Sequence, residues 1–292
     1  MFNISDDSKD FKDKNQLEGL EKENNIYFDK ESNTKFLLIY ESKLIFQYDH
    51  RFAEFKDCSI DDINQGNPKK ISYTQKNVNY YITPRYWIEE KKFKNKKVNW
   101  NWDNDWFLAI RLITRGTDSR TSICSIIPNY PSVNSLNLLL GITAIEAVYL
   151  ISNINSIVFD YVSRQKISGA NLNQFILEQL PIVDFKKWQN YEHFIIPKVL
   201  ELIYTSEELK IFANECGYEG DVYKWDEERR LIIKAELDAI VTLLFKLSRK
   251  DLAYIIDSFK VLKKNELKEF NEFKTKRLIL KAYDEFSKII II

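Results

Sequence analysis

The stretch between residues 143 and 181 has the clearest helical pattern in the chain. Thr143 and Glu146 have the T-x-x-E spacing of a capping box, which predicts the start of a helix. Apolar residues then recur at helical spacing, namely Ala144, Val148, Ile151, Ile154, Val158 and Val162. Polar residues mark the other side, which we expect to face solvent: Asn153, Ser156, Asp160, Ser163 and Arg164. Gly169 is placed to end this long helix in a left-handed conformation, which glycine adopts without steric cost.

Periodicity along the rest of the chain indicates an α+β fold. Alternation in the first half predicts a mixed, twisted β-sheet from the Phe36–Ile127 region, with strands at 35–40, 79–88, 105–113 and 121–127. Helical spacing in the last third predicts a helix capped by Asp226 and extending through Leu247, another after the Ser248/Asp251 capping pair, and a final one over 273–289. We therefore divide the chain into a polar, linker-like segment (1–35), of which residues 1–17 are expected to be irregular, a central domain (36–190) and a helical region (191–292).

Composition excludes several classes of protein. The three cysteines are far apart and odd in number, which suits a reducing cytoplasm rather than a disulfide framework. With only two histidines besides, a zinc site is not expected. The N-terminus is polar and acidic, unlike a signal peptide, and no apolar run of about 18 residues predicts a membrane span. We expect a cytoplasmic protein without a membrane partner.

Charge is unevenly distributed although the formal net charge is zero. Residues 1–64 carry 9 Lys/Arg against 15 Asp/Glu, residues 65–190 carry 16 against 9, and residues 191–292 carry 18 against 19. A basic middle section between acidic flanks is typical of a local surface that binds a polyanion, although solvated runs of charge are also common.

Two basic features lie in this middle section. Five lysines, Lys91, Lys92, Lys94, Lys96 and Lys97, fall within seven residues, either as a solvated hairpin tip or as a flexible run that contacts phosphates. Arg115 and Arg120 flank a Gly-Thr-Asp-Ser turn between two predicted strands. That turn is able to offer both guanidinium groups to one groove of DNA, although a pair of surface arginines fits equally well.

Catalytic motifs are missing. Asp49-His50-Arg51 invites a histidine–carboxylate interpretation, but neighbours in a strand point to opposite faces, and no nucleophile accompanies them. There is no P-loop, H-E-x-x-H, G-x-S-x-G, G-x-G or Pro-Pro motif. Glu236 and Asp238 are conceivable nuclease carboxylates, but they lie in a helix whose pattern favours packing. We expect no catalytic residue in this chain.

Several ordered motifs resemble one family. Residues 155–181 contain Asn-Ser, Phe-Asp-Tyr, Arg-Gln-Lys, Ser-Gly, Asn-Leu-Asn and Gln-Leu-Pro in that order, and Gln-Tyr-Asp-His-Arg precedes them at 47–51. Further matches lie at 107–128, 254–259 and 275–284. This order resembles the TaqI-like C-terminal specificity region of large adenine-specific restriction–modification methyltransferases, including phage-defence enzymes of the BREX and DISARM type. Ser42 stands where the family pattern has a glycine.

The resemblance implies a module that recognises a double-stranded DNA sequence, with residues 36–190 as the target-recognition domain. It further implies a split or truncated adenine-N6 methyltransferase whose catalytic partner, a subunit or domain, binds S-adenosylmethionine; this chain would bind no cofactor. The alternatives are a cryptic enzyme, such as a nuclease or a methyltransferase half active only on assembly, and a decayed remnant. The candidate DNA-binding residues are Lys91, Lys92, Lys94, Lys96, Lys97, Arg115, Arg120, Arg164, Lys166, Ser168, Asn171 and Asn173.

The missing motifs generate a direct prediction. The purified chain should transfer no methyl group to DNA, because it lacks both the glycine-bearing cofactor loop and the Asn-Pro-Pro-aromatic motif of this family. Incubation with labelled S-adenosylmethionine and mixed-sequence DNA measures this. Label transfer at an enzymatic rate would show that the chain carries a methyltransferase site.

Overall fold

The computed structural model describes residues 1–290, of which the architecture is α+β, as predicted. The strands are β1 (Glu21–Glu23), β2 (Ile26–Asp29), β3 (Thr34–Leu38), β4 (Ala53–Glu54), β5 (Lys69–Lys70), β6 (Trp87–Glu89), β7 (Trp106–Arg111), β8 (Cys124–Pro128) and β9 (Leu136–Leu139). The helices are α1 (Ile4–Asp7), α2 (Ile60–Gln65), α3 (Glu90–Lys97), α4 (Ala144–Ile154), α5 (Ile157–Lys166), α6 (Gln174–Leu177), α7 (Phe185–Gln189), α8 (Glu192–Ile203), α9 (Lys210–Glu215), α10 (Glu227–Leu244), α11 (Arg249–Asp257), α12 (Lys260–Phe270) and α13 (Lys274–Phe286).

The strands form three small antiparallel sheets, which differs from the single mixed sheet that alternation predicts. Their orders are β1-β2-β3-β6, β4-β5 and β8-β7-β9. The predicted hairpin is confirmed, because β7 pairs with β8 in a register that places Leu108 opposite Ile126. Strand β9 covers the other edge of β7, so the backbone of this buried strand is paired on both sides.

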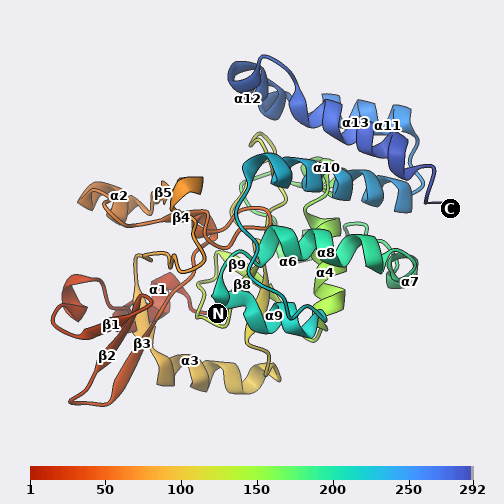
Figure 1. Cartoon of the computed structure of the whole chain (residues 1–292). Coiled ribbons are helices and arrows are strands. Elements are labelled where there is room, and N and C mark those ends of the chain that lie inside the picture. Colours follow the sequence, from red (N-terminus) through yellow and green to blue (C-terminus); the bar gives the residue numbers. More distant parts are fainter. Residues whose placement is uncertain (291–292) are drawn as a thin grey trace.

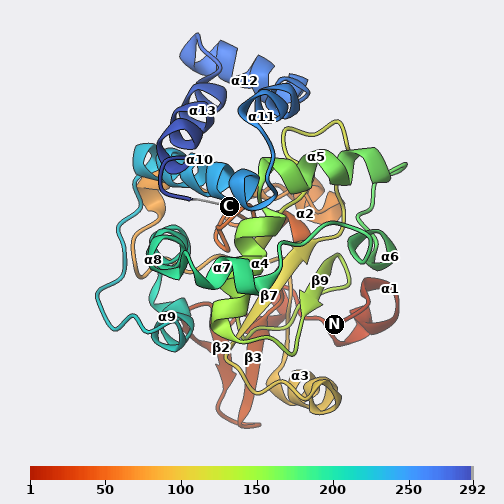
Figure 2. The same ribbon diagram turned by 90° about the vertical axis from the view of Figure 1, so that its right-hand side faces the viewer.

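The last four helices gather at one end of the molecule (Figure 1). Figure 1 shows α10–α13 together at the top, while β1–β3 and α3 lie at the opposite end, and the rotated view in Figure 2 preserves this separation. Among the described residues after 190, all regular elements are helical, as predicted. The Asp226 cap and the Ser248/Asp251 capping box are both present, although α10 ends at Leu244 and α13 ends at Phe286.

One cluster of buried apolar side chains extends from Phe2 to Ile290, across both predicted domain boundaries. The linker-like segment contributes Phe2, Phe11 and Leu17 to this cluster and supplies β1 and β2. The expectation that residues 1–17 are irregular was wrong, because they form α1 and two short 3-10 turns and three of their large apolar side chains are buried. A second cluster joins α5, α10, α11 and α13. The three-part division into domains stays a prediction.

The predicted long helix is broken into α4 and α5. The Thr143/Glu146 capping box is confirmed. Ser156, however, adopts an extended backbone, and its hydroxyl caps α5 by accepting a hydrogen bond from the Phe159 amide at 3.1 Å. Serine competes with helical hydrogen bonds in this way, which explains the break. The second helix ends at Lys166 with Ile167 as its cap, so Gly169 does not terminate it.

Two further local predictions were wrong. The lysine run is neither a hairpin tip nor a flexible segment, because it forms helix α3 with Phe93 buried. Of the strand predicted at 79–88, only Trp87 and Ile88 lie in a described strand, β6; Pro84 and most of the residues before it lie outside regular structure.

Candidate nucleic-acid interface

Two loops far apart in sequence lie side by side and form a continuous surface. One follows β7, and the other begins in the last turn of α5 and continues beyond it; we call residues 112–121 and 164–173 the paired loops. The Thr114 amide donates a hydrogen bond to the Ala170 carbonyl at 3.0 Å, and the Leu172 amide donates one to the Leu112 carbonyl at 2.8 Å. An isolated bridge between Ile113 and Asn171 adds to this contact. The structure thus brings together candidate residues that the sequence placed about fifty positions apart.

Most predicted polar residues of the paired loops are accessible. Arg115, Lys166, Ser168 and Asn171 are exposed, and Asn173 is half-buried at the N-cap of α6. The Arg115 guanidinium has no hydrogen-bond or ion-pair partner within residues 1–290, whereas its amide is tied to Asp118 Oδ2 at 3.1 Å. Lys166 makes a long contact of 3.5 Å with Gln179. These side chains can form new polar contacts without breaking strong internal ones.

Arg120, by contrast, is only 8 % exposed and serves the interior. Its Nε donates to Asp160 Oδ2 at 2.8 Å, and its Nη2 donates to the Asn155 carbonyl. The prediction that Arg115 and Arg120 present two guanidinium groups to one groove is therefore wrong. Asp160 neutralises Arg120 and orients it inward, which sequence spacing could not reveal.

Arg164 holds the first loop in place. Its Nε donates to Asp160 Oδ1 at 2.8 Å, while its Nη1 donates to the Gly116 carbonyl at 3.1 Å. Its Nη2 donates to two further loop carbonyls, those of Asp118 at 2.8 Å and Ser119 at 3.1 Å. With this many internal bonds, Arg164 positions the loop and is not free to read a base.

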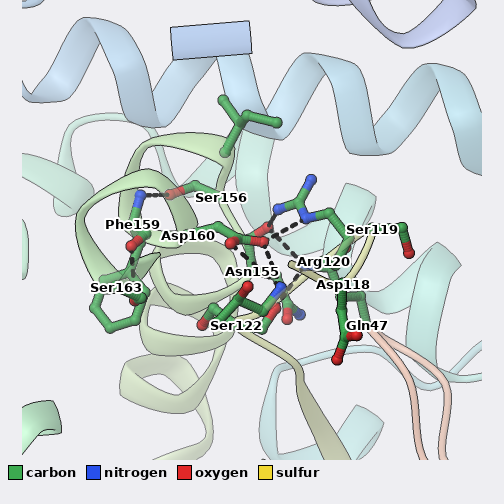
Figure 3. Close-up of polar contacts among 12 residues, drawn as sticks. Gln47, Asp118, Ser119, Arg120, Ser122, Asn155, Ser156, Phe159, Asp160 and Ser163 are labelled. Atoms are coloured by element: carbon green, nitrogen blue, oxygen red, sulfur yellow. Dashed lines mark hydrogen bonds and ion pairs between the residues drawn. The ribbon is translucent and has the colours of Figure 1, made fainter. Parts of the chain in front are cut away.

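The Asp160 carboxylate organises this arrangement. It is fully buried and accepts hydrogen bonds from Arg120, from Arg164 and from the Thr121 amide. Figure 3 shows it beside Arg120 and Asn155, with dashed lines marking polar contacts among the residues drawn. The Asn155 side chain bonds both the amide and the carbonyl of Cys124, at 2.8 and 2.9 Å. Strand β8 is thereby fixed to the junction between α4 and α5.

The prediction that the polar side of residues 153–163 faces solvent was wrong. Asn153, Ser156, Asp160 and Ser163 are all buried. Asn153 bonds the Pro181 carbonyl at 3.2 Å and the Val183 amide at 3.0 Å, so it anchors the chain that returns after α6. The expectation failed because distant segments supply partners for Asn153 and Asp160, and backbone groups of the same segment supply them for Ser156 and Ser163. Gln165 and Lys166 are exposed, and Arg164 is half-buried.

Most of the lysines on α3 already have partners in the folded chain. Ion pairs link Lys92 to Asp10 at 2.7 Å, Lys94 to Glu90 at 2.8 Å and Lys96 to Asp7 at 2.6 Å. Lys97 bonds the Asn104 carbonyl and Asn129, whereas Lys91 has no polar partner within the described chain. Helix α3 packs near Phe107, at the end of β7 opposite the paired loops, roughly 20 Å away at 3.3 Å per strand residue.

A second group of buried charges surrounds Asp49-His50-Arg51. Asp49 pairs with Lys76 at 2.5 Å, and His50 lies 3.6 Å from Glu208. Arg51 Nη2 donates to the Thr205 carbonyl at 2.6 Å, linking this segment to the end of α8. Burial lowers the pKa of His50, which keeps the imidazole neutral near pH 7. These contacts support a structural role and provide no nucleophile beside the histidine.

A cleft of about 790 Å³ lies next to the paired loops, and we call it the α10 cleft. Its lining includes Gln47, Arg120, Lys234 and Asp238, together with residues of α12 and Thr275 of α13. Burial lowers the pKa of Lys234 to about 7 and raises the pKa of Asp238 to about 6. Asp238 Oδ1 accepts a hydrogen bond from the Ile157 amide at 2.6 Å. That contact agrees with the packing role expected from its helix pattern.

Gln47 and Lys234 are not among the candidates that the sequence indicates. In the sequence, Lys234 is notable only as a lysine within the largely apolar run at 231–244. The cleft that it lines is formed by segments that are distant in the sequence. Glu236, the other conceivable nuclease carboxylate, pairs with Lys198 at 2.5 Å.

Metal and membrane features are not found in the part of the chain that the structure describes. Within residues 1–290, no group of three or more His, Cys, Asp or Glu side chains is arranged to hold a metal ion. None of the helices in that range is long and apolar enough to cross a membrane. Comparison of the chain with protein-family models, curated proteins and solved structures finds no match.

The Asp160 network makes a strong prediction about stability. Replacing Asp160 by Asn should lower the free energy of unfolding by about 3–5 kcal/mol, because the buried Arg120 guanidinium and the half-buried Arg164 guanidinium lose their counter-charge. Denaturant unfolding monitored by tryptophan fluorescence measures the change. Glu178→Gln, at an exposed position just after α6, is the control and should change stability by less than about 0.5 kcal/mol. Equal effects in both variants would contradict the role given to Asp160.

Lys234 generates a pH-dependent prediction. Its folded-state pKa of about 7 lies below the usual value of 10.5, so stability is lost as pH falls from 10.5 through 7. Lys234→Met removes this loss and should raise stability more at pH 6 than at pH 9. Unfolding curves of both proteins at the two pH values measure the difference. A gain that is the same at both pH values would mean that the ammonium is not destabilised by burial.

Proposed function

We propose that this chain is a recognition module for double-stranded DNA, and that the paired loops are its DNA-facing surface. The observation that carries the proposal is a rigidly held polar surface. Backbone hydrogen bonds join the two loops. The buried Asp160 carboxylate holds them in position by accepting hydrogen bonds from Arg120 and Arg164. A surface that is already ordered before binding loses little entropy on binding.

The exposed side chains suit duplex DNA. Arg115 and Lys166 provide positive charge, and Arg115 can donate a bidentate pair of hydrogen bonds to guanine. Asn171 can bond adenine in the same way, whereas Ser168 and Asn173 offer further donors and acceptors. Each good bidentate pair contributes about 1–3 kcal/mol of discrimination between bases.

Helix α3 contributes less in this proposal. Three of its five lysines are in ion pairs and a fourth bonds neutral oxygens, so contact with phosphates requires them to leave existing partners. Lys91 and the partly exposed Lys94 are the best placed of the five for a phosphate contact. We therefore assign sequence reading to the paired loops and, at most, a backbone contact to α3.

The resemblance to specificity regions of adenine-specific methyltransferases supplies the rest of the proposal. The catalytic domain and S-adenosylmethionine belong to a partner subunit or domain, and this chain selects the target site. We therefore assign the chain to a restriction–modification or phage-defence system that acts in the cytoplasm.

Competition between selected and random duplexes at two salt concentrations tests the proposal. Arg115→Ala and Lys166→Ala should weaken binding of all sequences and lower the log–log salt slope by ~0.9 for each phosphate that is no longer neutralised. Asn171→Ala should instead relax sequence preference, as should Arg115→Ala if it reads guanine. The matched control is Lys187→Ala, an exposed lysine on α7 outside the paired loops.

The outcomes are distinct. Weaker binding by the paired-loop variants with an unchanged control supports the assignment. Unchanged affinity, salt slope and preference in all variants would place DNA on another surface, and a wild-type chain that binds no duplex even with a methyltransferase partner would overturn the function.

A further inference from the structure

The α10 cleft contains polar groups that the fold itself does not use. Its volume of about 790 Å³ is within the range of small-molecule sites, about 300–1,000 Å³. It lies beneath the Ser119–Arg120 end of the first paired loop, between that loop and helix α10. Figure 3 shows Ser119, Arg120 and Gln47, which all line the cleft, on one side of Asp160.

Most carboxylates at the rim have structural partners. Asp226 accepts the Arg229 amide at 3.0 Å as the cap of α10, and Glu227 accepts the Trp225 indole N–H at 3.0 Å. Glu228 pairs with Lys274 at 2.7 Å, and Glu266 accepts the Thr275 amide at 2.8 Å. These four acids are thus explained by helix capping and packing, without a ligand.

At the floor of the cleft, by contrast, several polar atoms have no partner among the described residues. Arg120 uses Nε and Nη2 internally, but Nη1 has no partner in the described structure. Asp238 uses Oδ1, and Gln47 uses only its amide nitrogen, which leaves Oδ2 and Oε1 unbonded among residues 1–290. The Lys234 ammonium likewise makes no hydrogen bond or ion pair with any described residue. Residues that line this one cavity therefore have two donor groups and two acceptor atoms without partners in the described chain.

Aromatic rings line the same cavity. Phe46 lies next to Gln47, and its ring stacks on Phe52 at 4.7 Å, which holds it in place. Phe270 and Tyr73, both exposed, also contribute to the lining. Planar apolar surfaces beside alternating donors and acceptors match the chemistry of a heterocyclic base, which stacks through its faces and hydrogen-bonds through its edge.

We propose that the α10 cleft binds an unpaired nucleobase, with Arg120, Lys234, Asp238 and Gln47 meeting its polar edge. The acidic rim favours an uncharged base over a phosphate inside the cavity, since phosphate would be repelled by Glu227 and Glu269. The Asp238 carboxyl, with a pKa raised to about 6, is mostly ionised near pH 7 and accepts hydrogen bonds from the base edge; below pH 6 its protonated form can also donate. This inference does not depend on duplex recognition by the paired loops.

Titration of the full chain with 2-aminopurine deoxyriboside, a fluorescent nucleoside, tests the proposal without duplex DNA. Binding should be saturable, competed by deoxyadenosine or another natural nucleoside, and not competed by deoxyribose 5-phosphate. Lys234→Met and Phe270→Ala should each weaken binding about tenfold or more, because the first removes a charged donor and the second removes a stacking surface. Both residues are at least partly accessible, so neither change removes a core side chain.

Two controls keep this test independent. Lys224→Met, an exposed lysine outside the cleft, should bind the nucleoside like wild type, and Arg115→Ala should do the same even where it impairs duplex binding. Absence of saturable binding would overturn the proposal, as would binding that neither cleft variant changes. Binding of spermidine in place of the nucleoside would also overturn it and assign the cleft to a cationic ligand.

Discussion

The buried carboxylate of Asp160 joins parts of the chain that no local pattern connects. It accepts hydrogen bonds from Arg120 and from the Thr121 amide on the β7–β8 connection, and from Arg164 one helical turn further along α5. A fully buried charge is tolerated only when its oxygens are satisfied by charged or dipolar donors, and here several donors share two oxygens. Both paired loops take their position from this carboxylate.

The break between α4 and α5 places Asp160 correctly. A continuous helix would carry the polar residues past the strands, whereas the turn at Asn155 and Ser156 lets Asn155 bond the Cys124 backbone. The Asp238 carboxylate accepts a hydrogen bond of 2.6 Å from the Ile157 amide, the first amide of α5. Strand β8, helix α5 and helix α10 are thus tied together by side chains that replace main-chain pairing.

Nearby carboxylates decide which basic side chains of the middle section are available to a ligand. Charges near opposite charges in the fold become internal supports, as with Arg120 and Arg164 beside Asp160 and with Lys92 and Lys96 beside the acidic N-terminal segment. Charges on exposed loop tips, such as Arg115, stay available to a ligand. A local excess of lysine and arginine therefore overestimates the surface that a polyanion can contact.

The sequence alone determined the features that depend on neighbouring residues. The capping boxes at Thr143 and Ser248, the β7–β8 hairpin and the helical last third follow from short-range hydrogen bonding and hydrophobic periodicity, and all are present. The tertiary structure decided which polar residues are buried and which are exposed. Periodicity separates apolar from polar positions, but it cannot show that Arg120 lies opposite Asp160, or that Lys234 and Gln47 share a cleft, because those partners come from distant segments.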